Sequence, residues 1–481
     1  MKAAFIALEK RSLQYGAVFT VGPLGLLVAL CCGLHLGWTS PYLPVLLSED
    51  SPIPMTADES SWVGTVYLLG GVCGSVLLSV FGRLIGRKSI LLWSSVPFCT
   101  SWIIIAFATT LPELLIGRYI AGVCEGLCFA SLPIYFSEIS DKEIRGMISS
   151  TASITLFVGV MVINLVGSYT TIQTSSLVLL SVPLLHLLTF IWMPESPNYL
   201  LMKGKIKEAR RSFVALKGTE DADRNLDMIA RAIEEENVNQ TNFTCLLRRN
   251  NRRKLVTLFG LRLAQQFSGI TAFSIYAQIL FKEGDASIPP VLGVMIFYGI
   301  QLIFSILSSL LVDKLGRRPL LMASSIGAVV TLLVEGAFFF VRDFIRADTS
   351  HVSLLPTVVL FVFIVSYSLG LQTMPNFMAS ELFPTNLKAY ASTVATVLLY
   401  AFGAISTELF QFTKDNYGLF VPFWSFAIVC SVGSVIVAIF LPETKNRTLE
   451  DIQTELNQQT SGPTSGSDQA RQAGAAATIE G

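Results

Sequence analysis

The sequence predicts an all-α, multi-pass membrane protein with twelve transmembrane helices in two parallel six-helix repeats. Three observations support this fold class. Of the 481 residues, 52% are hydrophobic and only 14% are charged, and long apolar runs recur along nearly the whole chain. Lysine and arginine gather in alternate connections between these runs. The same polar landmarks also occur, in the same order, in both halves of the chain.

A helix that crosses the hydrocarbon core needs roughly 20 mostly apolar residues. By this criterion the first repeat has helices near 17–37, 61–81, 90–110, 113–137, 147–169 and 174–193. The second repeat has helices near 255–281, 289–312, 319–341, 354–380, 386–411 and 418–441. The expected domains are a first six-helix bundle over 1–194, a linker with short helices over 195–254, a second bundle over 255–442, and a tail over 443–481 that is disordered at its end.

The basic residues predict the orientation of the chain. The linker holds thirteen lysines and arginines. Because six crossings precede it and six follow it, the linker lies on the same side of the membrane as both termini. The other basic clusters fall on that side too, and they are Arg87/Lys88, Lys142/Arg145, Arg317/Arg318 and Lys445/Arg447. The connection after the first predicted helix has four acidic residues and no base. Because basic loops stay in the cytoplasm, both termini and the linker are predicted to be cytoplasmic, in a protein of the plasma membrane.

Matching landmarks indicate an internal repeat. In each half a carboxylate and a base stand seven residues apart, as Glu138 with Arg145 and Glu381 with Lys388. Two further matches are Gly86-Arg87-Lys88 with Gly316-Arg317-Arg318 and Pro194-Glu195-Ser196 with Pro442-Glu443-Thr444. Six helices per repeat make the two halves parallel. Parallel repeats with a binding site between them near the midplane are typical of secondary transporters.

The stretch 262–276 is unusually polar for a membrane segment. On a continuous helix, Gln265, Ser268, Ala272 and Tyr276 would share one face. Such a face could form the wall of a binding cavity, or its polar groups could bond to neighbouring helices in a packed interior. The position of the stretch on the first helix of the second repeat favours the cavity wall.

Two carboxylates lie within predicted transmembrane helices, where a charge costs roughly 2.5 kcal/mol or more. Glu125 is either a coupling or substrate-binding group or a partner for Arg118 on nearly the same helix face. Glu335 lies near a helix end and is expected to reach toward the interface. His35, alone in an apolar helix, is expected to be a hydrogen-bonded packing residue.

Several classes of protein are excluded by the composition. The net charge is zero, so nothing indicates a nucleic-acid partner. Neither the three scattered histidines nor the eight cysteines have the spacing of a metal site or a disulfide framework. The sequence also has no phosphate-binding glycine loop and no catalytic triad. The protein is therefore expected to be neither an enzyme nor a cofactor-binding protein.

Seven motifs point to one family. They are Gly117-Arg118, Pro133-x-Tyr135-x-x-Glu138, Arg145-Gly146, Pro194-Glu195-Ser196-Pro197, Gln265-Gln266-x-Ser268-Gly269, Asp313-x-x-Gly316-Arg317-Arg318 and Pro442-Glu443-Thr444. From about Gly33 to Ile452 the chain resembles the sugar-porter family of the major facilitator superfamily, which includes facilitative glucose and insect trehalose transporters.

The resemblance implies a cytoplasmic gate of ion pairs. Its bases are Arg87, Arg145, Arg317 and Arg318, and its acids are Glu138, Glu195, Asp313, Glu381 and Glu443. These pairs would hold the cytoplasmic ends together when the cavity opens outward and would separate when it opens inward. Each pair is worth ~0–1 kcal/mol, so a network biases the two states without locking either. The alternative is that the charges only set the topology.

The resemblance also implies a set of substrate-binding residues: Gln265, Gln266, Thr271, Tyr276, Gln301, Ser153, Asn376 and Tyr400. The two glutamines stand as in the family, and their amides suit sugar hydroxyls. Elsewhere the chain departs from the family pattern, with Thr271 in place of an asparagine and Asn376 in place of a stacking tryptophan. Each lost contact is worth ~1 kcal/mol or more, so an altered sugar or a non-sugar polyol is an open alternative.

The sequence thus predicts a monomeric facilitative carrier of a sugar, trehalose or a hexose, that works by alternating access. Proton-coupled relatives have an aspartate at the position of Leu34, so the neutral side chain favours facilitated diffusion. Two alternatives are a carrier of another polyol or organic solute, and a sugar sensor that does not transport. A sensor is expected to need a longer interaction tail.

Overall fold

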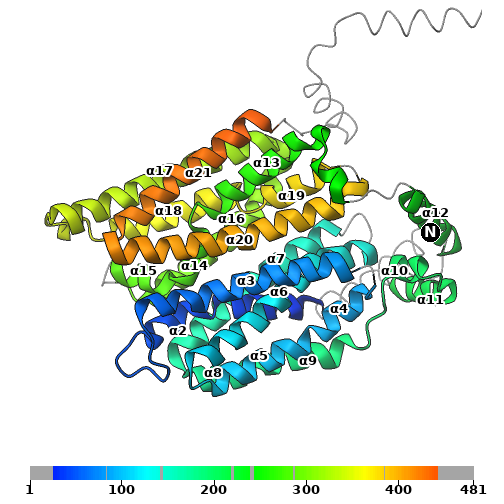
Figure 1. Ribbon diagram of the computed structural model, residues 1–481, viewed down its shortest axis with the longest axis horizontal. Helices are drawn as coiled ribbons and strands as arrows, with labels where there is room; N and C mark the ends of the chain where they lie inside the picture. Colours follow the sequence, from blue (N-terminus) through cyan, green and yellow to red (C-terminus); the bar gives the residue numbers. More distant parts are fainter. Residues whose placement is uncertain are drawn as a thin grey trace, which may run out of the picture.

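The computed structural model shows two helical bundles side by side (Figure 1). It describes residues 25–82, 84–140, 145–217, 222–238, 243–284, 288–383 and 385–441. Eleven helices in this part of the chain are long and apolar enough to cross a membrane. Together with one broken crossing, they form the twelve-helix, two-repeat fold class that the sequence predicts, which is confirmed.

The first bundle starts with the span Gly25–Leu46, which ends in α2 (Thr39–Leu46). It continues with α3 (Ala57–Phe81), α4 (Arg87–Trp93), α5 (Ser95–Phe107), α6 (Leu111–Ile139), α7 (Arg145–Tyr169), α8 (Ile172–Leu179) and α9 (Ser181–Phe190). Capping boxes begin α3 and α6, formed by Thr56 with Glu59 and by Thr110 with Glu113. They satisfy N–H groups that have no partner within the helix.

Glycines let α3 and α6 pack with their backbones in contact. A Cβ atom on Gly122 would lie 1.9 Å from the carbonyl oxygen of Tyr67, and one on Gly126 would lie 2.3 Å from that of Gly71. No other residue fits at such distances. Small residues at helix interfaces are a common means of packing in membranes, where lipid tails are as apolar as the side chains they replace.

Between the bundles, the chain forms α10 (Pro197–Met202), α11 (Ile206–Lys217), α12 (Ala222–Val238) and the short η1 (Phe243–Leu247). Helices α10 to α12 cover one end of the molecule (Figure 1) and enclose a small apolar core of Leu200, Ala209, Phe213 and Leu226. Arg210 Nε donates a hydrogen bond of 2.7 Å to Asp223, which lowers the pKa of that carboxyl.

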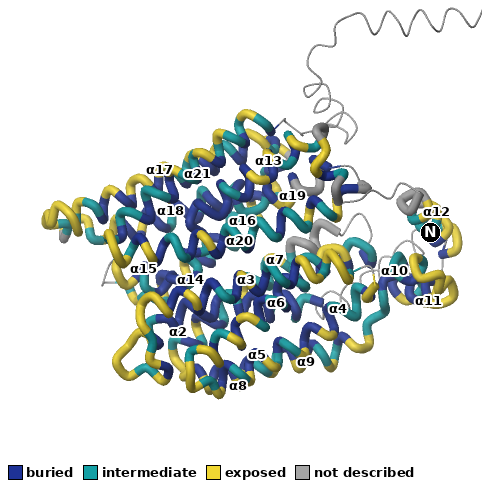
Figure 2. The backbone as a smooth tube through the Cα atoms, in the orientation of Figure 1, coloured by how far each residue is buried: buried dark blue, intermediate teal, exposed yellow. Residues whose placement is uncertain are grey.

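The second bundle consists of α13 (Arg249–Gln266), α14 (Ile270–Ile275), α15 (Ala277–Gly284), α16 (Pro290–Leu315), α17 (Arg317–Phe339), η2 (Phe340–Ile345), η3 (Ser350–Val352), α18 (Leu355–Leu369), α19 (Met374–Glu381), α20 (Thr385–Tyr417) and α21 (Phe420–Phe440). Many large apolar residues are exposed in both bundles. Figure 2 shows exposed positions along the outer faces of the bundles and buried positions between the helices. An apolar outer surface is typical of helices that face lipid.

Two predicted helices differ from the structure. The first ends at Leu46 instead of residue 37, because Thr39 hydrogen-bonds inside the protein and its polarity does not end the helix. The prediction of one continuous helix over 255–281 is wrong, since α13, α14 and α15 divide this segment. The face shared by Gln265, Ser268, Ala272 and Tyr276 therefore does not exist as a helical stripe.

Candidate functional site

The seventh crossing breaks where its polar residues are most concentrated. Helix α13 ends at Gln266, and α14 begins after Gly269, whose φ of 86° is left-handed. A Cβ atom at this position would lie 2.5 Å from Phe426, so both the backbone and the packing require glycine. As a result, Gln265 and Gln266 stand in the last turn of a helix inside the protein.

A hydrogen-bonded group of five polar residues surrounds this helix end. We call Arg262, Gln265, Gln301, Gln372 and Asn376 the central network. Arg262 Nη1 donates to Gln265 Oε1 at 2.5 Å, and Arg262 Nη2 donates to Asn376 Oδ1 at 2.8 Å. Gln265 Nε2 donates to the carbonyl oxygen of Gln372 at 3.2 Å. The side chains come from α13, α16 and α19 and from the turn before α19.

The network extends toward α16 through Gln372. Gln301 Nε2 donates to Gln372 Oε1 at 3.3 Å, and Gln372 Nε2 donates to Ser305 Oγ at 2.7 Å. Two buried atoms of the network, Arg262 Nε and Gln301 Oε1, have no hydrogen-bond partner among the described residues. A buried polar atom without a hydrogen bond costs free energy. A polar ligand that bound these two atoms would remove that cost.

Gln266 lies next to the central network but has a different partner. Thr271 Oγ1 donates to Gln266 Oε1 at 2.5 Å, across the break between α13 and α14. Gly403 of α20 faces this pair, because a Cβ atom there would lie 3.4 Å from the same amide oxygen. The threonine that replaces the family asparagine therefore still bonds within the site.

Tyr400 connects the two bundles. Its ring lies so close to Gly71 of α3 that a Cβ atom there would be 2.6 Å away, and it meets Phe129 of α6 edge-on at 6.5 Å between centroids. Tyr400 also interacts electrostatically with Arg262 in its own bundle and with Glu125 in the other. It therefore lies between the central network and the polar residues of the first bundle.

In the first bundle, Arg118 is buried and fully engaged. It donates to the carbonyl oxygen of His35 at 2.7 Å, to Thr39 Oγ1 at 3.0 Å and to the carbonyl oxygen of Val63 at 3.3 Å. Its guanidinium also lies 4.4 Å from the centroid of the Tyr67 ring. Arg118 thus ties α6 to the first crossing and to α3.

Glu125 is buried two turns further along α6, on nearly the same face, and interacts with both Arg118 and the Tyr67 hydroxyl. Its Oε2 atom has no hydrogen-bond partner among the described residues. Of the two interpretations of Glu125, pairing with Arg118 has support in these contacts. His35 stacks on Trp102 at 4.1 Å between centroids, which confirms that it is a packing residue. The hydrogen bond expected of it is not formed with any described residue, since neither ring nitrogen has a partner there.

Two of the expected substrate-binding residues lie apart from the central network. Tyr276 is buried, stacks on Phe410 at 5.1 Å between centroids and has no hydrogen-bond partner for its hydroxyl among the described residues. It stands near Glu408 and Asp415, at the end of the molecule opposite α10 to α12. Ser153 is exposed on α7 of the first bundle.

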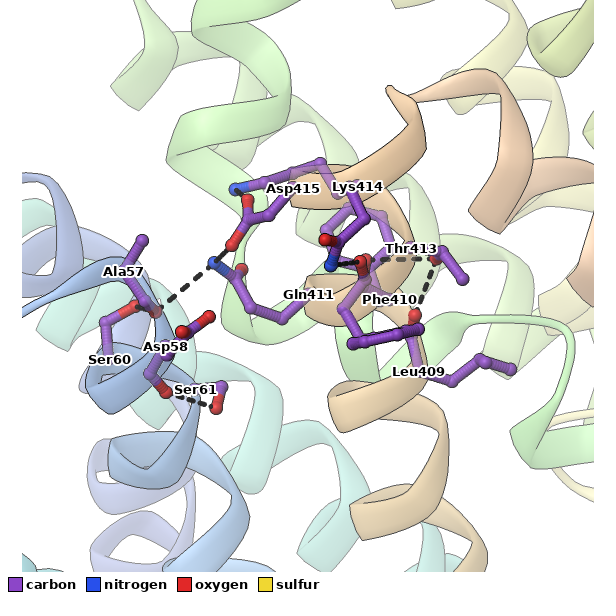
Figure 3. Close-up of polar contacts among 12 residues, drawn as sticks. Ala57, Asp58, Ser60, Ser61, Leu409, Phe410, Gln411, Thr413, Lys414 and Asp415 are labelled. Carbon is purple, nitrogen blue, oxygen red and sulfur yellow. Dashed lines mark hydrogen bonds and ion pairs between the residues drawn. The ribbon is translucent and has the colours of Figure 1, made fainter.

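At that opposite end, hydrogen bonds join the two bundles. Glu408 of α20 accepts from Thr65 Oγ1 at 2.6 Å and from Ser61 Oγ at 3.1 Å. Gln411 Nε2 donates to the carbonyl oxygen of Ala57 at 3.3 Å, where the start of α3 faces the last turns of α20 (Figure 3). We call Ser61, Thr65, Glu408 and Gln411 the closing contacts.

The expected gating charges lie at the other end, near α10 to α12. Arg87 pairs with Glu138 at 3.5 Å, and both residues belong to the first bundle. Glu195 accepts from the backbone N–H of Lys88 at 2.9 Å, and Arg318 donates to the carbonyl oxygen of Ala438 at 2.7 Å. Arg317 begins α17. The side chains of Arg145, Asp313 and Glu381 and all of Glu443 lie outside the described part of the chain.

The sequence prediction missed three members of the site: Arg262, Gln372 and Ser305. A signal for Arg262 existed, because a lone arginine inside an apolar run is expensive and therefore functional by default. Gln372 and Ser305 carried no such signal, since neutral polar residues are common in membrane helices. Among the described residues there is no group of His, Cys, Asp and Glu side chains that could hold a metal ion.

Comparisons with known proteins agree with this architecture. Residues 55–456 match the family model described as "Sugar (and other) transporter". The chain is 30% identical to the facilitated trehalose transporter Tret1 of Apis mellifera ligustica, over 90% of this chain and 88% of that protein. It is 32% identical to Tret1 of Drosophila yakuba over 88% of this chain, but it spans only about half (50%) of that relative's length, as it does for Tret1 of Drosophila willistoni.

Among solved structures, the xylose transporter XylE from E. coli in an inward open conformation superposes with a TM-score of 0.75. At 19% identity, the match covers 91% of this chain and 99% of that one, and it supports the fold. The family model covers most of the chain, and the Apis relative matches along nearly its full length. The chain therefore belongs to the sugar transporter family of the major facilitator superfamily.

Proposed function

We propose that the protein is a facilitative carrier of a carbohydrate that works by alternating access. The observation that carries this proposal is the central network, a set of amides and one guanidinium that meets the first bundle through Tyr400. Amides offer both donors and acceptors to hydroxyl groups, as a polyhydroxylated substrate requires. The relatives named as trehalose transporters make trehalose and hexoses the first substrates to test.

Alternating access is supported by the distribution of contacts between the bundles. The closing contacts join them at the end opposite α10 to α12. At the other end, the described ion pair between Arg87 and Glu138 stays within one bundle. Contacts that join the bundles at one end are what a carrier closed on that side would show.

The orientation and location belong to the same proposal. The basic linker and both termini would face the cytoplasm, and the carrier would act in the plasma membrane as a monomer, since one chain supplies both bundles. Attachment of glycans at the Asn239 or Asn242 sequon, seen as a glycosidase-sensitive shift in mobility, would contradict this orientation.

Uptake by purified protein in liposomes tests the function. Radiolabelled trehalose, glucose, fructose and polyols would be offered to the wild type and to Gln265→Ala. We expect saturable uptake of at least one carbohydrate and a loss of about tenfold in Gln265→Ala, because about 1–2 kcal/mol of hydrogen bonding is removed. Uptake that survives this substitution would remove Gln265 from the site. A wild type that carries none of these solutes would refute the function.

Transport without a coupling ion is tested in the same liposomes. With Leu34 buried in the first crossing and Arg118 saturated by neutral acceptors, we expect uptake to equilibrate and not to concentrate the substrate. Imposing a pH gradient, with and without a protonophore, measures this directly. Accumulation that the protonophore abolishes would show proton symport.

A further inference from the structure

Arg262 is a buried cation whose partners are neutral. Its two Nη atoms donate to the amide oxygens of Gln265 and Asn376, and its Nε has no partner among the described residues. The electrostatic neighbours of its guanidinium are the hydroxyls of Tyr367 and Tyr400. No described carboxylate lies within ion-pair distance of it. A charge at this depth without an opposite charge requires an explanation.

A structural role explains Arg118 but not Arg262. Each nitrogen of the Arg118 guanidinium donates a hydrogen bond to an acceptor on another helix, and the group also lies over two aromatic rings. Arg118 therefore needs no ligand to satisfy its donors. Arg262 instead donates to two side chains of the candidate site itself, and one of them, Asn376, is exposed. Its Nε has no hydrogen-bond partner in the described part of the chain. Arg262 is therefore built into the wall where a substrate would bind.

The charges around the site do not balance. Glu125 interacts with Arg118, its cation within the first bundle, and Tyr400 interacts with both Glu125 and Arg262. The other buried carboxylate, Glu335 of α17, interacts with Arg342. Among the groups around Tyr400, two buried arginines thus face one carboxylate, which leaves the charge of Arg262 without an opposite charge. In a low-dielectric interior, a single anionic group on the substrate would neutralise it.

We propose that the substrate is an acidic carbohydrate, a sugar monocarboxylate of the hexuronate class, and that Arg262 binds its carboxylate. Nε and Nη2 form one edge of the guanidinium fork, and this edge matches the two oxygens of a carboxylate. Nε is free, and Nη2 would exchange its bond to Asn376 for the substrate. The released amide of Asn376 and those of Gln265 and Gln301 would bind the sugar hydroxyls. This inference rests on the proposed carrier function and specifies its substrate class.

The test compares an acidic, a neutral and a basic sugar in proteoliposomes. Labelled D-glucuronate, D-glucose and D-glucosamine would be offered to the wild type, Arg262→Gln and Arg262→Lys. The matched control is Arg253→Gln, which removes an arginine of the same helix that lies over the Phe440 ring, outside the central network. A potassium gradient with valinomycin would set the membrane potential.

We expect the wild type to transport glucuronate in preference to glucose and glucosamine. A membrane potential that is positive inside the liposome should speed the entry of glucuronate, because this substrate carries a negative charge. Arg262→Gln should lower glucuronate uptake roughly 30-fold while glucose uptake stays within a few-fold, since a desolvated charge pair is lost. Arg262→Lys should retain part of the preference. Arg253→Gln should leave the preference unchanged.

Other outcomes separate the two proposals. Wild-type uptake of glucose or trehalose that glucuronate neither matches nor inhibits would overturn the acidic substrate and leave the carrier function intact. This comparison needs no variant and holds even if Arg262→Gln fails to fold. Equal losses of glucuronate and glucose uptake in a folded Arg262→Gln protein would also overturn it. Uptake of none of the sugars would refute the carrier function itself.

Discussion

At the scale of single residues, Arg118 is the clearest case of a charge used for architecture. Its side chain holds together the first crossing, α3 and α6 through the carbonyl oxygens of His35 and Val63 and the hydroxyl of Thr39. Removing the guanidinium leaves these buried acceptors unpaired, and hydrogen bonds to charged groups are each worth about 1.5–3 kcal/mol.

We therefore predict that Arg118→Leu lowers the stability of the first bundle by about 3 kcal/mol or more, measured as a fall in Tm in detergent. Arg210→Leu provides the control, because this arginine is exposed and its ion pair is with Asp223, which is also exposed. An unchanged Tm in Arg118→Leu would mean that the three crossings are held by apolar packing alone.

The residue scale also shows where sequence reasoning reached its limit. The glutamines at 265 and 266 were predictable, because paired amides in an apolar run need buried partners. Glu335 was not. Its expected position at the interface is wrong, since Glu335 is 2% exposed and both its carboxylate oxygens are buried. Which polar residue faces which helix depends on tertiary packing, which hydropathy does not encode.

At the scale of elements, the broken seventh crossing is the feature that makes the site. A continuous helix would satisfy its own backbone and would turn Gln265 and Gln266 to faces set by the helical period. The break at Gly269 instead ends α13 inside the protein and allows Thr271 to bond Gln266. The sequence showed the glycine and the polar cluster, but not the left-handed conformation of Gly269 or its close contact with Phe426.

We predict that Gly269→Ala lowers uptake at least tenfold, because a left-handed alanine costs about 1–2 kcal/mol and its Cβ would also displace Phe426. Gly204→Ala is a matched control. Gly204 has a φ of 71°, but nothing lies within 4 Å of the added Cβ, and it stands between α10 and α11. Equal effects of the two substitutions on uptake would assign the loss to backbone strain and not to the geometry of the site.

At the scale of the whole molecule, the two-bundle fold was predictable and the relation between the bundles was not. Apolar runs and repeated landmarks determine the number of crossings and their pairing into halves. The relative position of the halves depends on a few contacts worth little energy each, such as those of Glu408 with Ser61 and Thr65. Neither hydropathy nor the repeat singles out these three residues.

The closing contacts lead to a prediction about the conformational equilibrium. Glu408 accepts two hydrogen bonds from the other bundle, and replacing its carboxylate weakens both, because charge-assisted bonds are about twice as strong as neutral ones. Glu408→Gln should therefore shift the population toward the state that is open at this end, by roughly tenfold for a loss of about 1.4 kcal/mol.

A disulfide between engineered cysteines at Ala57 and Gln411 reports this shift, since the carbonyl oxygen and the amide of these residues meet only when the end is closed. We expect slower cross-linking in the Glu408→Gln background, and we expect the cross-link to block uptake until a reductant is added. Glu113→Gln removes a carboxylate that caps only its own helix, so it should leave the rate unchanged. A cross-linking rate that does not respond to Glu408→Gln would mean that apolar contacts between α3 and α20 hold this end closed. In that case the equilibrium between the two states would have to be controlled at the opposite end, by the charges around Arg87 and Glu138.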